Sequence, residues 1–249
     1  MLEQVLLVTG GSRGIGAATA LLAASQGFAV AVNYTANAAA ADEVVRRIRA
    51  GGGKSVALQA DVSQEHQVLA MFEKVDAELG RLTALVNSAG VVDRAARVEE
   101  MSFERLRRMF DVNVIGSFLC AREAVRRMST RHGGRGGAIV NVSSAAARLG
   151  APGEYVDYAA SKGAIDAFTI GLAKEVAAEG IRVNAVRPGL IDTEIHASGG
   201  SPDRVRQLAG QVPMQRGGTA HEVAEAIVWL LSSAASYTTL SLLDVSGGR

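Results

Sequence analysis

The stretch Val5–Gly16, VLLVTGGSRGIG, decides the fold. Val5 to Thr9 is a continuous apolar run typical of a buried strand, and it breaks at once into glycines. Glycine lets the backbone come close to a ligand there, and free N–H groups at a helix N-terminus favour a phosphate. The glycines lie in a strand-to-helix turn, because the residues that follow recur with helical period: Ile15, Ala18, Thr19, Leu22 and Ala23.

The spacing of these glycines indicates the kind of phosphate site. A Walker loop has a lysine after its last glycine, whereas Ala17 follows Gly16 here, and GxGxxG is absent too. The pattern from Thr9 to Gly16 is TGxxxGxG. We interpret it as a turn that binds a pyrophosphate; a glycine-rich turn without function is the alternative.

Strands and helices continue to alternate after this turn. Thr219 and Glu222 form a capping box before an apolar helical stripe, and Ser63 is predicted to cap a helix that buries Val68, Met71, Phe72 and Val75. Helices are also expected at Ala41–Ile48, Phe103–Val112, Asn113–Met128 and Asp157–Gly180, and strands at Phe28–Tyr34, Ser55–Gln59, Ala84–Ser88, Ala138–Ser143, Ile181–Arg187 and Leu242–Val245.

This alternation predicts an α/β fold. A doubly wound parallel sheet of about seven strands has helices on both faces and a ligand crevice at the carboxyl ends of its strands. The chain has 249 residues, 48% of them hydrophobic and 20% charged, which suits one domain over residues 1–249.

Charge and cysteine content narrow the functional class. A net charge of +1 argues against a nucleic-acid or membrane partner. The single Cys120 allows no internal disulfide, and the four histidines have no zinc-ligand spacing, so no metal site is expected. The residues before Val5 are too few for a signal h-region, and no apolar run has the length of a membrane span. We expect a reducing, cytoplasmic location.

The stretch Ser144–Lys162, SAAARLGAPGEYVDYAASK, carries the candidate chemistry. Tyr158 and Lys162 are four residues apart, which places both side chains on one face of a helix. A nearby ammonium favours the phenolate, and lowering a tyrosine pKa from about 10 to about 7 takes roughly 4 kcal/mol. Ser144 can hold a substrate oxygen while Tyr158 moves the proton. This spacing alone is common by chance.

Several ordered motifs together resemble the short-chain dehydrogenase/reductase family in its compact single-domain form, similar to 3-oxoacyl-carrier-protein reductases and sugar dehydrogenases. The resemblance implies a Rossmann-type fold, NAD(P) as cofactor and the catalytic tetrad Asn113, Ser144, Tyr158 and Lys162. The motifs that carry it are TGGSRGIG at Thr9–Gly16, Asp61-Val62, NSAG at Asn87–Gly90, Asn113, Ser144, YAASK at Tyr158–Lys162 and RPGLIDT at Arg187–Thr193.

The resemblance also implies a role for each residue. Tyr158 would be the general acid and base, with Ser144 hydrogen-bonded to the same substrate oxygen. Lys162 would bind the nicotinamide ribose and lower the tyrosine pKa, and Asn113 would hold a water that relays protons, an ordinary helix cap being the alternative. The cofactor contacts would be Gly10, Ser12, Arg13, Gly14, Ile15, Gly16, Asn33, Tyr34, Asp61, Val62, Asn87, Ala89, Gly90, Tyr158, Lys162, Pro188, Gly189, Ile191 and Thr193.

The end of the second strand indicates which dinucleotide is preferred. An NAD site commonly has an acidic residue there, but this strand ends in Asn33, Tyr34 and Thr35. No carboxylate repels a 2′-phosphate, two of these side chains can donate to it, and Arg13 can offer its planar fork. We expect NADP(H) to be preferred, with NAD(H) possible.

Two positions depart from the family pattern. Ser88 stands where a second asparagine is frequent, a small polar change that leaves its neighbours in place. Thr239-Leu240 replaces the usual Thr-Gly before the last strand. Because leucine does not take a positive φ cheaply, the C-terminal segment is expected to be arranged differently.

The substrate stays open between a sugar, a polyol, a small ketone and a 3-oxoacyl group. An acidic acyl carrier could dock on Arg126, Arg127 and Arg131, which otherwise form a solvated helix face. The segment His196–Pro202, HASGGSP, is either a mobile lid or an ordinary loop. The resemblance places seven candidate pocket residues around the cleft, and a surface or packing role is the alternative favoured for each: Arg94, Ala146, Arg148, Glu154, Tyr155, Leu190 and His196.

The leading hypothesis is an NADP-dependent oxidoreductase that transfers a hydride to or from a carbonyl or alcohol. A catalytically silent NADP-binding regulator would lack the tetrad, and a sugar-nucleotide epimerase would need a larger C-terminal domain. The resemblance also suggests a homotetramer or homodimer. A small-residue stripe either allows close approach of a second copy or packs on the chain's own sheet: Ala160, Gly163, Ala164, Ala167 and Gly171.

Overall fold

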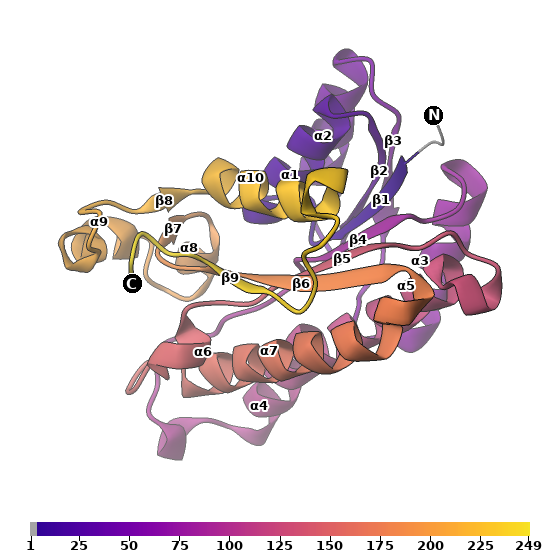
Figure 1. Ribbon diagram of the computed structural model, residues 1–249. Coiled ribbons are helices and arrows are strands. Elements are labelled where there is room, and N and C mark those ends of the chain that lie inside the picture. Colours follow the sequence, from indigo (N-terminus) through magenta and orange to yellow (C-terminus); the bar gives the residue numbers. More distant parts are fainter. Residues whose placement is uncertain (1–3) are drawn as a thin grey trace.

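Seven parallel strands form one sheet through the middle of the molecule, in the order β3-β2-β1-β4-β5-β6-β9 (Figure 1). The computed structural model describes residues 4–249. Met1–Glu3 lie outside the described residues, and the expectation that the N-terminal stretch holds no signal segment falls partly on them. The predicted doubly wound parallel sheet is confirmed. Its strands agree with the predicted ranges within one residue: β1 Gln4–Thr9, β2 Phe28–Tyr34, β3 Ser55–Gln59, β4 Ala84–Asn87, β5 Gly137–Val142, β6 Ile181–Pro188 and β9 Leu242–Val245.

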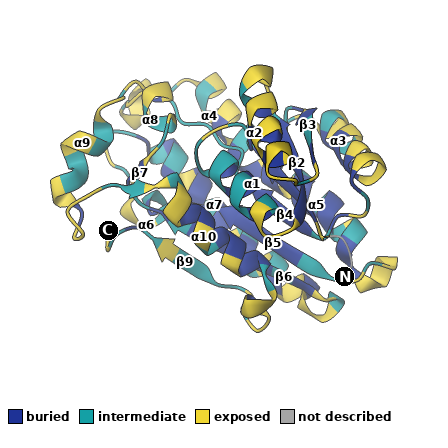
Figure 2. Ribbon diagram, turned by 90° about the horizontal axis from the view of Figure 1, so that it is seen from above, coloured by how far each residue is buried: buried dark blue, intermediate teal, exposed yellow. Residues whose placement is uncertain are grey.

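Helices cover both faces of this sheet and bury two separate apolar clusters (Figures 1 and 2). One layer consists of α1 (Gly14–Ser25), α2 (Ala38–Ala50) and α10 (Ala220–Leu231). The other consists of α3 (Glu65–Glu78), α5 (Gly116–Met128) and α7 (Val156–Val176), with α4 (Phe103–Phe110) beside α7. The central strands are mostly dark blue in Figure 2, because their side chains face helices on either side, whereas the edge strand β9 is teal and yellow.

Short elements connect these layers. A π-helical turn, Asp111–Ile115, joins α4 to α5. The sequence predicts two helices that meet directly at Val112 and Asn113, so the turn itself is not predicted. The described chain also contains α6 (Ala146–Leu149), α8 (Ile195–Ser198), α9 (Arg204–Leu208), the strand pair β7 (Ile191–Asp192) and β8 (Gly218–Thr219), and 3₁₀ turns at Val98–Glu100, Thr130–His132, Ala177–Glu179, Ala209–Gln211 and Ser233–Ala235.

The two predicted helix caps have different outcomes. The capping box at α10 is confirmed: Glu222 N donates to Thr219 Oγ1 at 3.2 Å, and Thr219 N donates to Glu222 Oε2 at 2.8 Å. The prediction that Ser63 caps α3 is wrong, because that helix starts at Glu65 with Gln64 before it. The Ser63 hydroxyl instead donates to Asp61 Oδ1 at 2.7 Å.

The expectation about Leu240 is also wrong. Its φ is +66°, so it takes the left-handed conformation that glycine normally supplies, and β9 still pairs with β6. The conformation costs about 1–2 kcal/mol for an L-residue. The Leu240 amide donates to Val183 O at 2.7 Å and the side chain packs on the apolar cluster under α3, α5 and α7, which offsets that cost.

No helix within residues 4–249 is long and apolar enough to cross a bilayer.

Candidate active site

The glycine turn lies between β1 and α1, against the chain that leaves β4. Gly10 has a φ of +61°, and a Cβ there would lie 2.9 Å from the Ala89 Cα. A Cβ on Gly16 would lie 2.4 Å from the Gly10 carbonyl oxygen. Side chains at either position would displace backbone, so the turn can approach its neighbours and a ligand only with glycine.

The start of α1 presents unpaired backbone donors. Among residues 4–249, the amides of Gly14, Ile15 and Gly16 have no acceptor, and the first helical hydrogen bond runs from Ala17 N to Arg13 O at 3.1 Å. The turn sits between β1 and β4, where the strand order reverses. Donors at a helix N-terminus in this crevice fit a dinucleotide pyrophosphate, so the residues present suit the expected cofactor.

Asn33 has a different role from the one predicted. Its side chain is 1% exposed, and its Nδ2 donates to Ala60 O at 3.0 Å and to Leu58 O at 3.3 Å. Its Oδ1 accepts from Gly10 N at 3.2 Å. Since its polar groups hold the glycine turn to the end of β3, Asn33 is not available to donate to a 2′-phosphate.

Arg13 remains available at this end of the crevice. It is exposed, its backbone is extended, and its guanidinium has no partner among residues 4–249. Tyr34 is half-buried and packs on the apolar cluster under α1, α2 and α10. The Arg13 guanidinium therefore remains available as a ligand of a 2′-phosphate, unlike the Asn33 amide.

The four predicted tetrad residues come together from distant parts of the chain. Ser144 follows β5, and its hydroxyl lies close enough to the Tyr158 phenol on α7 to act on the tyrosine pKa. Lys162 Nζ lies 5.6 Å from the centroid of the Tyr158 ring. A Cβ placed on Gly90 would lie 3.4 Å from Asn113 Oδ1 and 3.6 Å from Lys162 Nζ, so the glycine after β4 borders the same space.

The Asn113 side chain holds two segments of the chain together. The alternative that Asn113 is an ordinary helix cap is wrong, because this residue lies inside the π turn. Its Oδ1 accepts from Val91 N at 2.8 Å, and its Nδ2 donates to Val91 O at 3.0 Å and Ser161 Oγ at 3.1 Å. The side chain is 1% exposed. It thus joins the chain after β4 to α7.

Burial sets the protonation of the tyrosine and the lysine. It raises the pKa of Tyr158, and the hydrogen bond with Ser144 opposes that rise. Burial lowers the pKa of Lys162 to about 8, although Asp166 acts in the opposite direction. The expectation that Lys162 lowers the tyrosine pKa is therefore wrong for the chain by itself. The ammonium donates to Val142 O at 2.8 Å rather than to the phenol.

The remaining cofactor positions divide into rim and interior. The Asp61 carboxylate lies after β3 and accepts from Ser63. Asn87 is 4% exposed and donates to Asn141 Oδ1 at 3.0 Å, which fits a structural role. The Thr193 methyl group lies 3.4 Å from a Cβ placed on Gly14, so the loop after β7 faces the glycine turn. Three further predicted cofactor residues are buried: Val62, Pro188 and Ile191.

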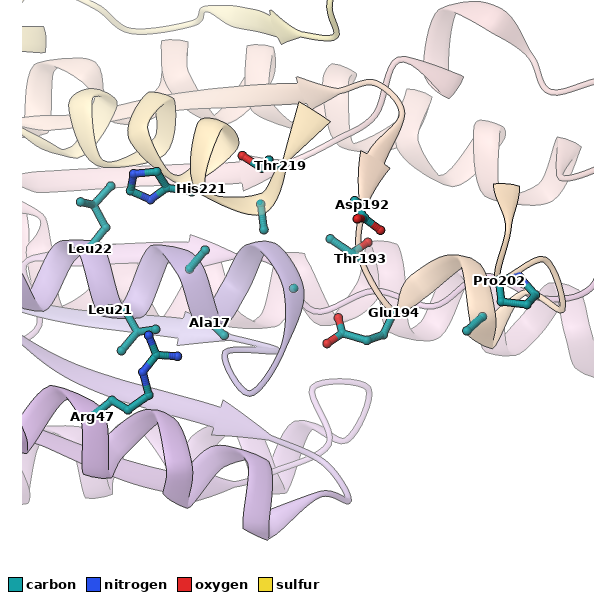
Figure 3. Close-up of a pocket in the computed structure, with 14 residues that line it drawn as sticks. Ala17, Leu21, Leu22, Arg47, Asp192, Thr193, Glu194, Pro202, Thr219 and His221 are labelled. Atoms are coloured by element: carbon teal, nitrogen blue, oxygen red, sulfur yellow. The ribbon is translucent and has the colours of Figure 1, made fainter. Parts of the chain in front are cut away.

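A cleft of about 940 Å³ opens beside α1 (Figure 3). Arg47, Leu21 and Leu22 lie on one side of it, and the segment Asp192–Glu194 lies across. Gly14 and Thr193 are the predicted cofactor residues that line it, and no tetrad residue does. The cleft borders the glycine turn and is separate from the tetrad.

The candidate substrate residues are mostly engaged by other side chains. Arg204 on α9 pairs with Glu154 at 2.5 Å and lies 5.3 Å from the Tyr155 ring centroid. Arg148 pairs with Asp244 at 3.1 Å. Leu190 is buried, His196 Nε2 lies 2.8 Å from Ile191 O, and burial lowers the pKa of His196.

The segment His196–Pro202 lies against the chain that leaves β4. A Cβ on Gly199 would lie 3.2 Å from Val92 Cγ1, and one on Gly200 would lie 3.6 Å from Arg94 Cγ. Arg204, which pairs with Glu154, follows this segment in the chain. These contacts are compatible with both a lid and an ordinary loop.

Comparison with known proteins agrees with this geometry. A family model described as enoyl-(acyl carrier protein) reductase matches residues 10–249. A crystal structure of a short-chain type dehydrogenase/reductase from Mycobacterium marinum superposes with a TM-score of 0.92 at 34% identity, covering 98% of this chain and 94% of the other. The chain belongs to the short-chain dehydrogenase/reductase family. Enzymes of this family use NAD(P)(H).

Two relatives of this dehydrogenase/reductase match over nearly their whole lengths. The uncharacterized oxidoreductase YgfF of Escherichia coli K12 is 61% identical over 98% of this chain and 99% of its own. Cis-4-hydroxycyclohexanecarboxylate dehydrogenase of Sinomonas cyclohexanicum is 41% identical over 99% and 96%. The chain is thus an oxidoreductase of the family.

Replacing Lys162 with methionine should stabilise the protein. A pKa lowered from about 10.5 to about 8 means that the buried ammonium costs roughly 3 kcal/mol below pH 8. Losing the hydrogen bond to Val142 O offsets part of this gain, so we expect the free energy of unfolding at pH 7 to rise by about 1–2 kcal/mol. Urea denaturation measures it.

The pH dependence supplies the check on this prediction. Wild-type stability should rise between pH 8 and about 10.5, because the unfolded state binds the proton more tightly there. The Lys162→Met variant should lack that rise, so the difference between the two proteins shrinks over this window. A constant difference would contradict a buried charge as the cause.

Proposed function

We propose that the chain, acting as one catalytic domain over residues 1–249, is an NADP(H)-dependent reductase of a carbonyl to a secondary alcohol. The observation that carries this proposal is that Ser144, Tyr158 and Lys162 meet at the end of β5, where Lys162 Nζ lies 5.6 Å from the Tyr158 ring centroid and burial raises the tyrosine pKa. A phenol that keeps its proton through neutral pH suits a general acid. All four tetrad positions are filled, which favours an enzyme over a silent cofactor-binding regulator.

Different residues of the crevice would bind the cofactor and act on the substrate. The amides of Gly14 to Gly16 would bind the pyrophosphate, and Lys162 would hold the nicotinamide ribose. NADPH, when bound, supplies the hydride that reaches the carbonyl carbon. Ser144 would hydrogen-bond the carbonyl oxygen, and Tyr158 would donate its proton as that oxygen gains negative charge. Asn113 would hold the wall of the site in place.

The raised tyrosine pKa gives the two directions opposite pH dependence. Reduction uses the phenol, so its rate is maintained through neutral pH and falls in alkali. Oxidation of an alcohol uses the phenolate, so its rate rises with pH toward the tyrosine pKa. The chain is therefore set for reduction near neutral pH.

We propose a small substrate rather than a carrier-bound one. Arg126, Arg127 and Arg131, which could dock an acidic carrier, are paired with Glu123, Asp76 and Glu179 respectively. The Sinomonas relative is named for a ring alcohol that carries a carboxylate. Small ring ketones, keto sugars and short 3-oxo compounds are the classes to test.

We also propose self-association through α4, α5 and α7. The stripe on α7 faces outward rather than onto the chain's own sheet: Ala160, Ala167 and Gly171 are exposed, and a Cβ on Gly163 or Gly171 would meet nothing within 4 Å. Phe118 on α5 stacks on Phe168 of α7 with centroids 3.8 Å apart. Exposed apolar side chains continue this surface: Phe103, Leu106, Phe110, Ile115 and Phe118.

Tyr158→Phe should nearly abolish NADPH oxidation with a panel of these carbonyl compounds, because it removes the transferable proton and keeps the ring. Cofactor affinity should stay within about threefold. Tyr237→Phe is the matched control, since Tyr237 is fully exposed. A Tyr158→Phe rate above about a tenth of wild type would show that another group donates the proton.

Arg13→Ala should weaken NADPH at least tenfold and leave NADH nearly unchanged. A charge-assisted hydrogen bond contributes about 1.5–3 kcal/mol, and each 1.4 kcal/mol is tenfold in affinity. Dissociation constants at one fixed salt concentration measure it, with exposed Arg46→Ala as a control for net charge. An equal loss of affinity for NADPH and NADH would contradict the assignment of Arg13 to the 2′-phosphate.

Light scattering should give a dimeric or tetrameric mass at micromolar concentration. Phe103→Arg with Leu106→Arg should reduce that mass, because charges would then stand in the apolar contact. A monomeric mass for the wild-type protein would end the proposal of self-association.

A further inference from the structure

A buried ion pair joins α4 to the residue before the candidate proton donor. Arg105 Nε donates to Asp157 Oδ2 at 2.8 Å and Arg105 Nη2 donates to Asp157 Oδ1 at 3.1 Å. Their side chains are 11% and 0% exposed. Arg105 Nη1 also donates to Arg94 O at 2.7 Å, on the loop that contacts the segment His196–Pro202. The guanidinium therefore ties three segments around Tyr158.

A second polar link lies one helical turn further along α7. Asn113 Nδ2 donates to Ser161 Oγ, and Ser161 Oγ donates to Tyr158 O at 2.7 Å. Asp157 and Ser161 are four residues apart, so they share one face of α7, which meets α4 and the π turn (Figure 1). Tyr158 and Lys162 each follow one residue later and share the adjacent face.

The two links thus control the rotation of α7 about its axis. A side-chain tip about 6 Å from the axis moves by roughly 1 Å when the helix rotates by 10°. A misplacement of 1 Å can cost about a hundredfold in rate. Apolar contacts permit such a rotation, whereas a bidentate guanidinium–carboxylate pair has a fixed geometry.

We propose that Arg105, through Asp157, is a positioning residue that aims Tyr158 at the substrate oxygen. This inference rests on the proposed function, in which Tyr158 donates the proton. Arg105 does not touch the reacting atoms; it acts on the rotation of α7. Its loss should lower kcat and leave cofactor binding intact.

The test replaces both charges, by Arg105→Met with Asp157→Leu, so that no buried charge is left unpaired and the fold is retained. We expect Tm to stay within a few degrees, the Kd for NADPH to stay within about threefold, and kcat to fall by about tenfold to a hundredfold. Arg105→Lys keeps the charge and loses the fork, so its kcat should be intermediate, and it serves if the double variant does not fold.

A matched control pair lies far from the tetrad. Arg127 on α5 and Asp76 on α3 are joined at 2.7 Å, and Arg127→Met with Asp76→Leu removes another interhelical ion pair. Glu123, which Arg127 also contacts at 3.0 Å, keeps Arg122 and Arg126 as partners. Its kcat should equal that of the wild type. A kcat within twofold of wild type for folded Arg105 variants, or an equal loss in the control pair, would overturn the inference.

The same assay separates this inference from the proposed function. Wild-type protein without turnover on the carbonyl panel, or with turnover that survives Tyr158→Phe, would end the proposed function. Turnover that is lost in Tyr158→Phe and kept in the Arg105→Met/Asp157→Leu variant would end only the positioning role.

Discussion

The close contact between the glycine turn and the chain leaving β4 is the constraint on which the rest of the structure depends. The Thr9 hydroxyl accepts from the Ser88 and Ala89 amides at 3.0 and 3.1 Å, and a Cβ on Gly10 would strike Ala89. Asn33 holds the same turn from the side of β2. This contact forms at the reversal of strand order, so it creates the crevice and brings Gly90 beside the tetrad.

Burial of an almost unpaired ammonium is the second feature of the site. Asp166, whose charge raises the Lys162 pKa, already has other partners: its carboxylate accepts from Ser143 at 2.7 Å and from Arg187 at 2.8 and 3.0 Å. Lys162 therefore keeps a poorly compensated charge, which lowers its pKa and costs stability. Because the buried Lys162 ammonium lowers the stability of the folded chain, hydrogen bonds from it to hydroxyl groups of a ligand would offset that loss of stability.

The helix α7 links this chemistry to the outer layer. Its face with Tyr158 and Lys162 meets the end of β5, and its neighbouring face is held by α4 and the π turn. The π turn inserts an extra residue into the helical path, and Asn113 lies within it. From this turn the Asn113 side chain bonds both Val91 after β4 and Ser161 on α7.

Local patterns in the sequence determined the strands, most helices and the glycine turn, because periodicity and turn signals act over a few residues. The tetrad was predicted from the resemblance to the family, since spacing alone relates only Tyr158 and Lys162. The ends of β2 and β9 were predicted to the residue. Only the tertiary structure decided which groups were already engaged: Asn33 in the turn, Glu154 with Arg204, Asp157 with Arg105. It also reversed the predicted shift in the Tyr158 pKa and gave Leu240 a positive φ. Desolvation and pairing depend on atoms far apart in the chain, which no local pattern contains.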